Sequence, residues 1–210
     1  MSKPFFSVIV PAHNAENHLR KCLDSIMSQT FKDFELIIVC DACTDRTSYI
    51  ANEYTAYTHH KLVYTEYGMD GLARNAGIDA AEGYWLIFMD DDDWFLHEYV
   101  FQQLYDAAVD TDADLLVFDF IWKGRGYYRN AGGNVNIAVW SKCWRRSFVG
   151  DTRFPAIPFT SDEPFMQEII AKKPRALFMG VPMYYYNYMR KGSQTELNAR
   201  PDEADVQKEG

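Results

Sequence analysis

Four consecutive aspartates follow directly on an apolar run over residues 84–89. The run is typical of a buried strand, whereas four adjacent carboxylates repel one another and add nothing to a core. Alternate side chains share one face of an extended backbone, so Asp90 and Asp92 can point the same way. Such a pair can hold Mg²⁺ or Mn²⁺, which takes substrate phosphates as further ligands. The alternative is a solvated acidic turn, because runs of charge are usually solvated.

The composition indicates a folded acidic protein. The chain has 210 residues, 48% of them hydrophobic, and a net charge of −9. A general nucleic-acid binder would need a basic face, so this class is disfavoured. No apolar stretch reaches the roughly 18 residues that span a membrane, and the run at 5–10 is too short for a signal peptide. We therefore expect a cytoplasmic protein without a transmembrane segment, either free or peripheral to the inner face of the membrane.

Cys40 and Cys43 form a Cys-x-x-Cys pattern, which occurs in redox motifs and in halves of zinc sites. A zinc site would need two further ligands, and Cys22 and Cys143 stand alone without paired spacing. The sequence favours the simpler interpretation, in which Cys40 and Cys43 are small residues of a loop between a strand and a helix.

Strand and helix signals alternate along the first half of the chain. They predict strands at 5–10, 34–39, 62–64, 84–89 and 115–118, and helices at 15–28, 44–57, 72–82 and 96–109. Asn14 is the expected N-cap of the first helix. This alternation predicts an α/β fold with a parallel, doubly wound sheet. Ligands of such sheets bind outside the carboxyl ends of the strands, where Asp41 and the aspartate run both fall.

The second half gives weaker signals. In chain order they predict a loop or weak hairpin at 123–136, extended chain at 154–158, a strand at 177–179 and a frayed polar tail at 196–210. A helix is expected to begin after Ser161, with Pro164 in its first turn.

An ordered series of motifs runs from residue 6 to residue 195. It comprises the segments 7–14, 29–30, 39–45, 73–77 (Ala-Arg-Asn-Ala-Gly), 88–94 (Phe-Met-Asp-Asp-Asp-Asp-Trp), 140–142, 145–148, 162–163, 184–186 and 193–195. In this order the motifs resemble glycosyltransferase family 2, inverting enzymes that use nucleotide sugars and have the GT-A fold. The resemblance implies one domain over 1–195 with a Rossmann-like, mostly parallel central sheet flanked by helices. Residues 1–95 would bind the nucleotide sugar, and residues 96–195, with a small C-terminal part, would bind the acceptor.

For the donor, the resemblance implies a nucleoside diphosphate sugar, with UDP as the expected nucleotide. Pro11, Ala12 and Asn14 would line the wall around the base and the ribose. Asp41 would accept a hydrogen bond from the base, although a helix N-cap is a common position for such an aspartate. Arg74 would contact the diphosphate or the acidic cluster, since its planar fork of donors suits both. A buried structural ion pair is the alternative for Arg74.

For the metal, the aspartate run resembles the family's Asp-x-Asp-Asp-Trp. This match makes Asp92 the direct ligand of Mn²⁺ or Mg²⁺ and assigns Asp90 to the ribose or to a metal-bound water. The extra aspartate leaves a second register, Asp91 with Asp93, which keeps Asp91 among the candidate donor-binding residues. The metal would act as a Lewis acid on the departing diphosphate.

The catalytic base is expected in the pair Asp162-Glu163 at a helix start, where the helix N-terminus keeps a carboxylate ionised. The family's base is the second member of a Glu-Asp pair, which by position gives Glu163. The order is reversed in this chain, so either carboxylate can serve. The alternative is that both only complement the helix dipole.

The resulting prediction is an inverting, metal-dependent glycosyltransferase of surface-polysaccharide biosynthesis that acts on a hydroxyl of a glycan or lipid-linked glycan. Two alternatives stay open. An inactive relative that binds sugar nucleotide or a partner enzyme is supported by the reversed Asp162-Glu163 pair and by Cys40 in place of the family's first aspartate. A nucleotidyltransferase would want a Gly-rich loop after the first strand, and residues 11–14 contain no glycine.

Overall fold

The computed structural model describes residues 3–56, 59–130, 136–158 and 160–188. The predicted tail at 196–210 and the motif at 193–195 lie outside the described residues. The helices and strands along the chain are β1 (Phe6–Ala12), α1 (Leu19–Met27), β2 (Phe34–Asp41), α2 (Thr47–Thr55), β3 (Lys61–Thr65), α3 (Asp70–Ala80), β4 (Trp85–Phe88), β5 (Trp94–Phe95), α4 (Val100–Val109), β6 (Leu115–Trp122), β7 (Gly126–Tyr128), a 3₁₀ turn (Val139–Ser141), β8 (Lys142–Arg145), α5 (Arg146–Val149), α6 (Asp162–Ala171) and β9 (Ala176–Tyr186). The strands form one sheet in the order β3-β2-β1-β4-β8-β6-β9-β5, with β7 paired to β6.

The first four strands of this order are parallel. β1 pairs with β2 and β4, and β2 pairs with β3, while α1, α2 and α3 supply the crossovers that parallel neighbours need. β1 is buried on both faces: Val8 and Val10 pack in one core cluster and Ile9 in the other, as the two-residue period of a strand requires. The predicted α/β sheet, mostly parallel and flanked by helices, is confirmed.

The second half adds antiparallel pairing that the sequence did not indicate. β8 is antiparallel to both of its neighbours, β4 and β6. The late strand predicted at 177–179 is the 11-residue β9, which includes the tyrosines 184–186 and pairs with β6 and β5. The loop or weak hairpin predicted at 123–136 contains β7, which forms a hairpin with the preceding strand β6, and residues 131–135 of this range lie outside the described residues. β5 and β8 have only two and four residues, too short for a periodic signal.

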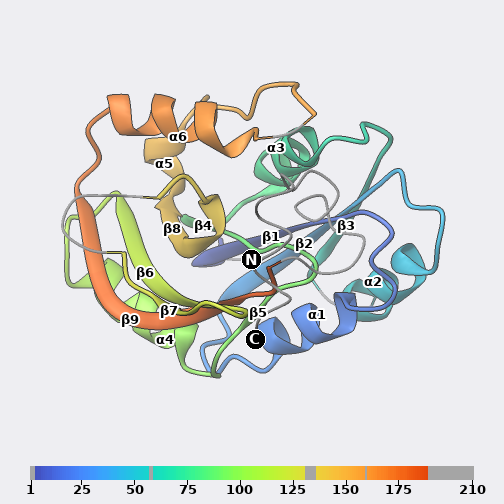
Figure 1. Ribbon diagram of the computed structural model, residues 1–210, viewed down its shortest axis with the longest axis horizontal. Coiled ribbons are helices and arrows are strands. Elements are labelled where there is room, and N and C mark those ends of the chain that lie inside the picture. Colours follow the sequence, from blue (N-terminus) through green and yellow to red (C-terminus); the bar gives the residue numbers. More distant parts are fainter. Residues whose placement is uncertain (1–2, 57–58, 131–135, 159, 189–210) are drawn as a thin grey trace.

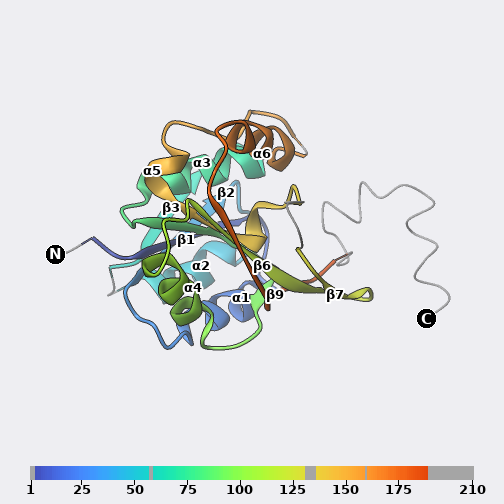
Figure 2. The same cartoon turned by 90° about the vertical axis from the view of Figure 1, so that its left-hand side faces the viewer.

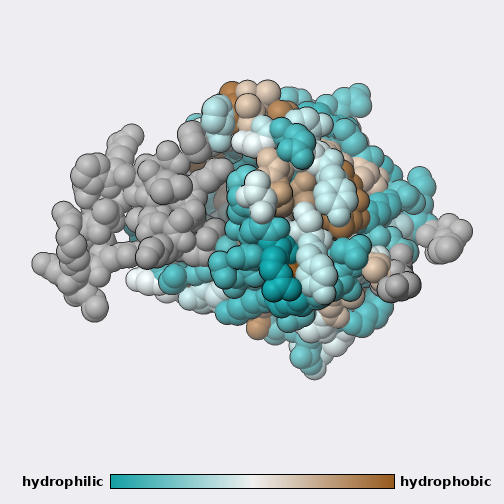
Figure 3. All heavy atoms as spheres, turned by 90° about the vertical axis from the view of Figure 1, so that its right-hand side faces the viewer, coloured by the Kyte–Doolittle hydropathy of each residue, from teal (hydrophilic) through white to brown (hydrophobic). Residues whose placement is uncertain are grey.

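Helices cover both faces of the sheet. Figure 1 and Figure 2 show α1, α2 and α4 on one face and α3, α5 and α6 on the other. Each layer encloses one core cluster, represented by Leu23 and Phe101 in the first and by Ile78 and Phe165 in the second. The side that carries α2 and the edge strand β3 is mainly hydrophilic (Figure 3). Among the described residues, no helix combines the length and the apolar character that a membrane crossing requires.

The first helix begins later than predicted, at Leu19 instead of Ala15, and Asn14 is not its N-cap. Asn14 has a φ of 48°, the left-handed conformation that asparagine tolerates better than most residues. Its Oδ1 accepts the N–H of Thr44 at 2.8 Å. Asn14 therefore turns the chain out of β1 and links this turn to the loop after β2.

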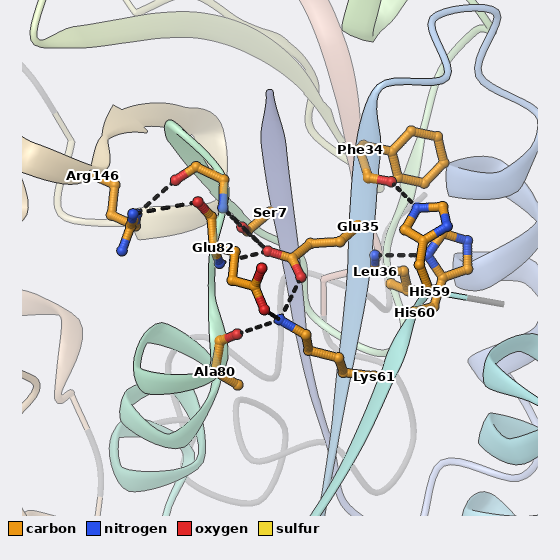
Figure 4. A network of polar contacts seen from close by, with 11 residues as sticks. Ser7, Phe34, Glu35, Leu36, His59, His60, Lys61, Ala80, Glu82 and Arg146 are labelled. Atoms are coloured by element: carbon orange, nitrogen blue, oxygen red, sulfur yellow. Dashed lines mark hydrogen bonds and ion pairs between the residues drawn. The ribbon is translucent and has the colours of Figure 1, made fainter. Parts of the chain in front are cut away.

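A buried carboxylate fixes the amino-terminal edge of the parallel strands (Figure 4). Glu35 accepts the Ser7 hydroxyl at 2.6 Å and the N–H of Glu82 at 2.6 Å, and it pairs with Lys61 Nζ at 2.8 Å. Burial raises the pKa of Glu35, but these partners more than offset it and hold the pKa below its usual value. These contacts attach the turn before β4 to β1, β2 and β3. They thereby fix the start of β4 and, through the strand, the position of its carboxyl end.

The carboxyl ends of β1 to β4 meet at the opposite edge because these strands are parallel. Ala12 ends β1, Asp41 ends β2, Thr65 ends β3, and the aspartate run follows β4. The chain thus brings most of the polar groups singled out in the first half of the sequence to one edge.

Gly77 on α3 packs against β1, and a methyl group at position 77 would overlap Cγ2 of Ile9. In an exposed helix, Gly77→Ala would stabilise by about 1 kcal/mol. Here we expect it to lower the free energy of unfolding by about 1–3 kcal/mol, the usual cost of overpacking, as measured by urea denaturation. In an Ile9→Ala background the same substitution should cost less. An equal cost in both backgrounds would contradict the close contact.

Candidate active site

His13 ties together the loops that follow β1, β2 and β4. Its N–H donates to Oδ2 of Asp91 at 3.1 Å, and its ring Nδ1 lies 2.7 Å from the carbonyl oxygen of Asp41. The bond from Thr44 to Asn14 adds a second link between the first two loops. These three loops therefore form one connected edge.

Pro11 and Ala12 lie at the buried end of β1 on this edge. The carbonyl oxygen of Ala12 accepts the Cys43 thiol at 3.3 Å. Cys40 is the penultimate residue of β2 and lies in the core, whereas Cys43 is in the loop, and both are free thiols. A hydrogen bond from Cys40 lowers the pKa of Cys43 to about 7, against the effect of burial. The prediction of two loop residues is thus right for Cys43 and wrong for Cys40, which is part of the strand.

Asp41 is buried and anchors the segment between β3 and α3. Its carboxylate accepts the Thr65 hydroxyl at 2.9 Å and the N–H groups of Tyr67 and Met69 at 2.7 and 3.0 Å. Asp41 does not cap α2, because the N–H of Thr47, the first residue of α2, donates to Asp45 at 2.8 Å, so that alternative is wrong. The contact of Asp41 with a nucleobase stays a prediction.

Arg74 joins two acidic residues that are far apart in sequence. From the first half of α3, its Nη2 donates to Oδ1 of Asp90 at 2.8 Å and its Nη1 to Oδ1 of Asp162 at 3.2 Å. Only 7% of the side chain is exposed. Burial would lower the pKa of Arg74, but Asp162 and Asp90 raise it, so the cation is permanent. Arg74 therefore contacts the acidic cluster, which also agrees with the alternative of a buried structural ion pair, and its contact with a diphosphate stays a prediction.

Carboxylates outnumber cations around Arg74. Burial raises the pKa of Asp90 to about 7, although Arg74 opposes the rise, and Asp162 and Asp92 add to it. Burial also raises the pKa of Asp70, again against the effect of Arg74. Because one guanidinium leaves these groups only partly neutralised, an additional positive charge would stabilise their ionised forms.

The four aspartates of the run have different environments. Asp93 is fully buried, and its two oxygens accept the Tyr184 hydroxyl at 2.6 Å and the N–H of Asn187 at 2.7 Å. Asp91 accepts from His13 and lies 3.4 Å from Nε2 of His18. In the second register, Asp91 and Asp93 would be the metal pair. This register therefore uses a carboxylate whose oxygens already accept the hydrogen bonds that hold β9 in place.

Asp162 and Glu163 both lie in the first turn of α6 but face different surroundings. Asp162 contacts Arg74 through Oδ1, and its Oδ2 accepts the N–H of Val139 at 3.2 Å. Glu163 is exposed and accepts Nε2 of Gln167 at 3.3 Å. Both oxygens of Asp162 thus accept hydrogen bonds from other parts of the fold, whereas the bond of Glu163 is to a residue of its own helix.

A buried lysine supports the segment that contacts Asp162. Nζ of Lys142 donates to Oδ1 of Asn136 at 2.8 Å and to the carbonyl oxygen of Ala138. Burial lowers the pKa of Lys142 to about 7, although the nearby Asp162 opposes this shift. Lys142 thereby fixes the turn whose Val139 N–H reaches Asp162.

The donor set suits a hard divalent cation. Asp90 and Asp92 are partly exposed and offer carboxylate oxygens, which Mg²⁺ and Mn²⁺ prefer. Within the described ranges, no group of three or more His, Cys, Asp or Glu side chains is arranged to enclose an ion. An ion bound here would take further ligands from water or phosphate oxygens, as Mg²⁺ commonly does.

Three contributors to the site were missed in the sequence. Asp70 lies four residues before Arg74 on α3, and this spacing could have indicated their proximity. The contacts of His18 with Asp91 and of Tyr184 with Asp93 cannot be predicted from the local sequence. The partners are far apart along the chain, and Tyr184 and Asp93 are separated by 91 positions.

Tyr184→Phe should remove the hydroxyl that donates to Asp93 and accepts the N–H of Asp90 at 3.3 Å, and it should leave a buried carboxylate oxygen without its partner. We expect the free energy of unfolding to fall by about 1–3 kcal/mol, measured by urea denaturation. Tyr185→Phe is the control, because Tyr185 stacks on Trp94 at 4.1 Å and its hydroxyl makes no hydrogen bond to the described residues. Similar losses in the two variants would show that Asp93 does not depend on Tyr184.

Solved structures with the same fold include complexes with nucleotide sugars. The S. aureus TarS structure in complex with UDP-GlcNAc superposes with a TM-score of 0.78 at 26% identity, covering 91% of this chain and 60% of that chain. The mannosyltransferase PcManGT from Pyrobaculum calidifontis, in complex with GDP-Man and Mn²⁺, superposes with a TM-score of 0.70 at 17% identity, covering 91% of this chain and 59% of that one. The second likeness concerns the fold alone.

Sequence comparison gives the same family. Glycosyltransferase GlyA from Streptococcus pneumoniae is 31% identical over 91% of this chain, which spans only 31% of the length of that relative. The family model "Glycosyl transferase family 2" matches residues 7–165, a range that contains the aspartate run, Arg74 and the Asp162-Glu163 pair. With the GT-A sheet and these motifs in place, the chain belongs to glycosyltransferase family 2.

Proposed function

We propose that this chain transfers a sugar from a nucleoside diphosphate sugar, with UDP as the nucleotide, to a hydroxyl of a glycan or lipid-linked glycan, and that it inverts the anomeric centre. The proposal rests mainly on the position of Arg74, whose single guanidinium contacts both Asp90 of the aspartate run and Asp162 of α6. The TarS complex with UDP-GlcNAc supports UDP as the nucleotide.

The donor is proposed to lie along the carboxyl edge within residues 1–95, and residues 96–195 are proposed to bind the acceptor. The base and ribose would rest against Pro11, Ala12 and Asn14, and Asp41 would lie at the base. Because Asp41 already fixes the chain between β3 and α3, it would also set the position of Arg74 relative to the nucleotide.

Asp92 would be the direct ligand of Mn²⁺ or Mg²⁺, with Asp90 beside it. When bound, the cation neutralises charge that develops on the departing diphosphate. Arg74 would add donors that suit a phosphate oxygen, and its buried Nε has no hydrogen-bond partner among the described residues. The chain's own part in the reaction is to orient the diphosphate and to accept the proton of the attacking hydroxyl.

Glu163 is the proposed base, and Asp162 is the proposed positioning residue. Both oxygens of Asp162 already accept hydrogen bonds, from Arg74 and from Val139. Glu163 is exposed at the start of α6, its side chain is longer by one methylene, and the helix N-terminus favours its ionised form. These features suit proton abstraction from an acceptor that arrives from solvent.

Asp92→Asn should weaken binding of UDP in the presence of Mn²⁺ by at least about tenfold, the effect of losing 1.5–3 kcal/mol from a charged contact. Isothermal titration with UDP and UDP-GlcNAc, with Mn²⁺ and with EDTA, measures this effect. Asp112→Asn is the matched control, because Asp112 is 94% exposed and pairs only loosely with Arg175. If UDP binds equally with and without Mn²⁺, or if the two variants bind alike, the proposed metal site is wrong.

Glu163→Gln should lower kcat for sugar transfer by about 10²–10⁴-fold, the usual contribution of a general base, with little change in KM for the donor. Asp162→Asn should instead raise KM for the donor, because it releases Arg74. Glu168→Gln is the control, because Glu168 lies five residues later on α6 and accepts the Thr152 hydroxyl at 2.6 Å. Wild-type kcat in Glu163→Gln together with a large loss of kcat alone in Asp162→Asn would move the base to Asp162. Metal-dependent binding without any turnover by the wild-type chain would favour the inactive relative.

A further inference from the structure

A hollow of 440 Å³ lies on the other side of the molecule from the proposed active site, and arginines line it. Its lining includes Arg145, Arg146 and Arg153, together with Tyr84, Ser147 and Asp151. Tyr84 immediately precedes β4, and Arg145 pairs with Trp85 at the first register position of β8 on β4. The hollow therefore opens at the amino-terminal edge of β4. In Figure 2, α5 lies at the side where β1 begins, and β7 projects from the opposite side.

Positive charge is concentrated here in a protein whose net charge is −9. Three guanidinium groups line the hollow against one carboxylate, that of Asp151. Arg153 is neutralised in part by Asp79 at 2.8 Å. Arg145 approaches a carboxylate of Asp114 only at 3.7 Å, and that group bonds more closely to another arginine.

Arg146 differs from the other two because its contacts are to backbone oxygens. Its Nε donates to the carbonyl of Gly83 at 2.6 Å, and its Nη2 lies 3.3 Å from the carbonyl oxygen of Glu82. Within the described ranges, no carboxylate lies within ion-pair distance of it. Figure 4 shows the guanidinium at the edge of the Glu35 network, with one nitrogen directed away from that network. Neutral partners thus fix the group and leave its charge uncompensated.

The neighbouring guanidinium is oriented in the same way. Arg145 donates through Nε and Nη2 to the carbonyl oxygen of Ala113 at 2.9 and 2.6 Å and lies over the ring of Trp85. A guanidinium held by a carbonyl loses little further freedom when its remaining N–H groups bind a ligand. A planar fork of donors matches the oxygens of a phosphate group. We propose that this hollow, here called the arginine hollow, binds a phosphate-bearing anion, carried either by a small soluble molecule or by a lipid headgroup.

The site and its ligand are separate from the proposed transferase chemistry, because the three arginines that line the hollow make no hydrogen bond or ion pair with the aspartate run, Arg74 or Asp162 in the described structure. The test therefore omits divalent metal. Inorganic pyrophosphate is titrated into the full chain in EDTA, and binding to vesicles of phosphatidylcholine with and without 30% phosphatidylglycerol is measured by co-sedimentation. If the phosphate group belongs to a small soluble molecule, pyrophosphate should bind saturably at one site. If it belongs to a lipid headgroup, the chain should bind only to the anionic vesicles.

In either case Arg146→Gln should weaken the interaction at least tenfold, and Arg146→Lys, which keeps the charge but loses the fork, should weaken it less. Arg20→Gln is the matched control, because Arg20 is on α1 and pairs with Glu53 at 2.6 Å. If Arg146→Gln has a lower melting temperature than the wild type in circular dichroism, the binding comparison is made with Arg153→Gln and Ser147→Ala instead. The proposal is overturned if the wild type binds neither probe, or if the folded hollow variants bind as the wild type does.

Discussion

The buried guanidinium of Arg74 is the interaction on which the candidate active site depends. It contacts Asp90, just beyond β4, and Asp162, at the start of α6, so one residue sets the distance between the two acidic segments. Without this cation the two carboxylates would repel each other at short range in a largely dry environment. Removal of one partner from such a group leaves the remaining charges buried and uncompensated, which costs more than the net stabilisation of the pair. The proposed donor and acceptor sides of the site are therefore positioned together.

The pKa values of Glu35 and Asp90, carboxylates at the two edges of the sheet, are shifted in opposite directions. At the amino-terminal edge, the partners of Glu35 hold its pKa below the usual value, so this group is satisfied by the protein itself. At the carboxyl-terminal edge, burial and like charges raise the pKa of Asp90 to about 7 despite Arg74. A satisfied carboxylate stabilises the fold, whereas an incompletely neutralised one favours the binding of a cation. β4 connects the two environments, since the turn fixed by Glu35 leads into the strand that ends at Asp90.

The parallel half of the fold could be predicted because its signals are local. β1, β2 and β4 are buried on both faces and appear in the sequence as mostly apolar runs, and the helices between them show their own period. The antiparallel half could not be predicted in the same way. The pairing of β8 between β4 and β6, and of β5 with β9, is decided by tertiary contacts of very short segments. Its residue type predicts Asn14 as a helix cap, because the sequence does not reveal that its backbone is left-handed.

For the site, the residue types indicated the kind of chemistry but not the contacts. The alternation of Asp90 and Asp92 could be anticipated from strand geometry, whereas the anchoring of β9 by Asp93 could not. The resemblance pointed to Arg74 and to the Asp162-Glu163 pair without indicating that Arg74 bridges the two acidic segments. As proposed, this bridged acidic edge binds the metal and the diphosphate together. A crystal structure of the chain with UDP and Mn²⁺, with anomalous data collected above the manganese edge, tests it most directly. We expect a manganese peak between Asp92 and the diphosphate, with Arg74 still in contact with Asp90. A nucleotide bound elsewhere, or a manganese peak remote from Asp92, would contradict the proposed site.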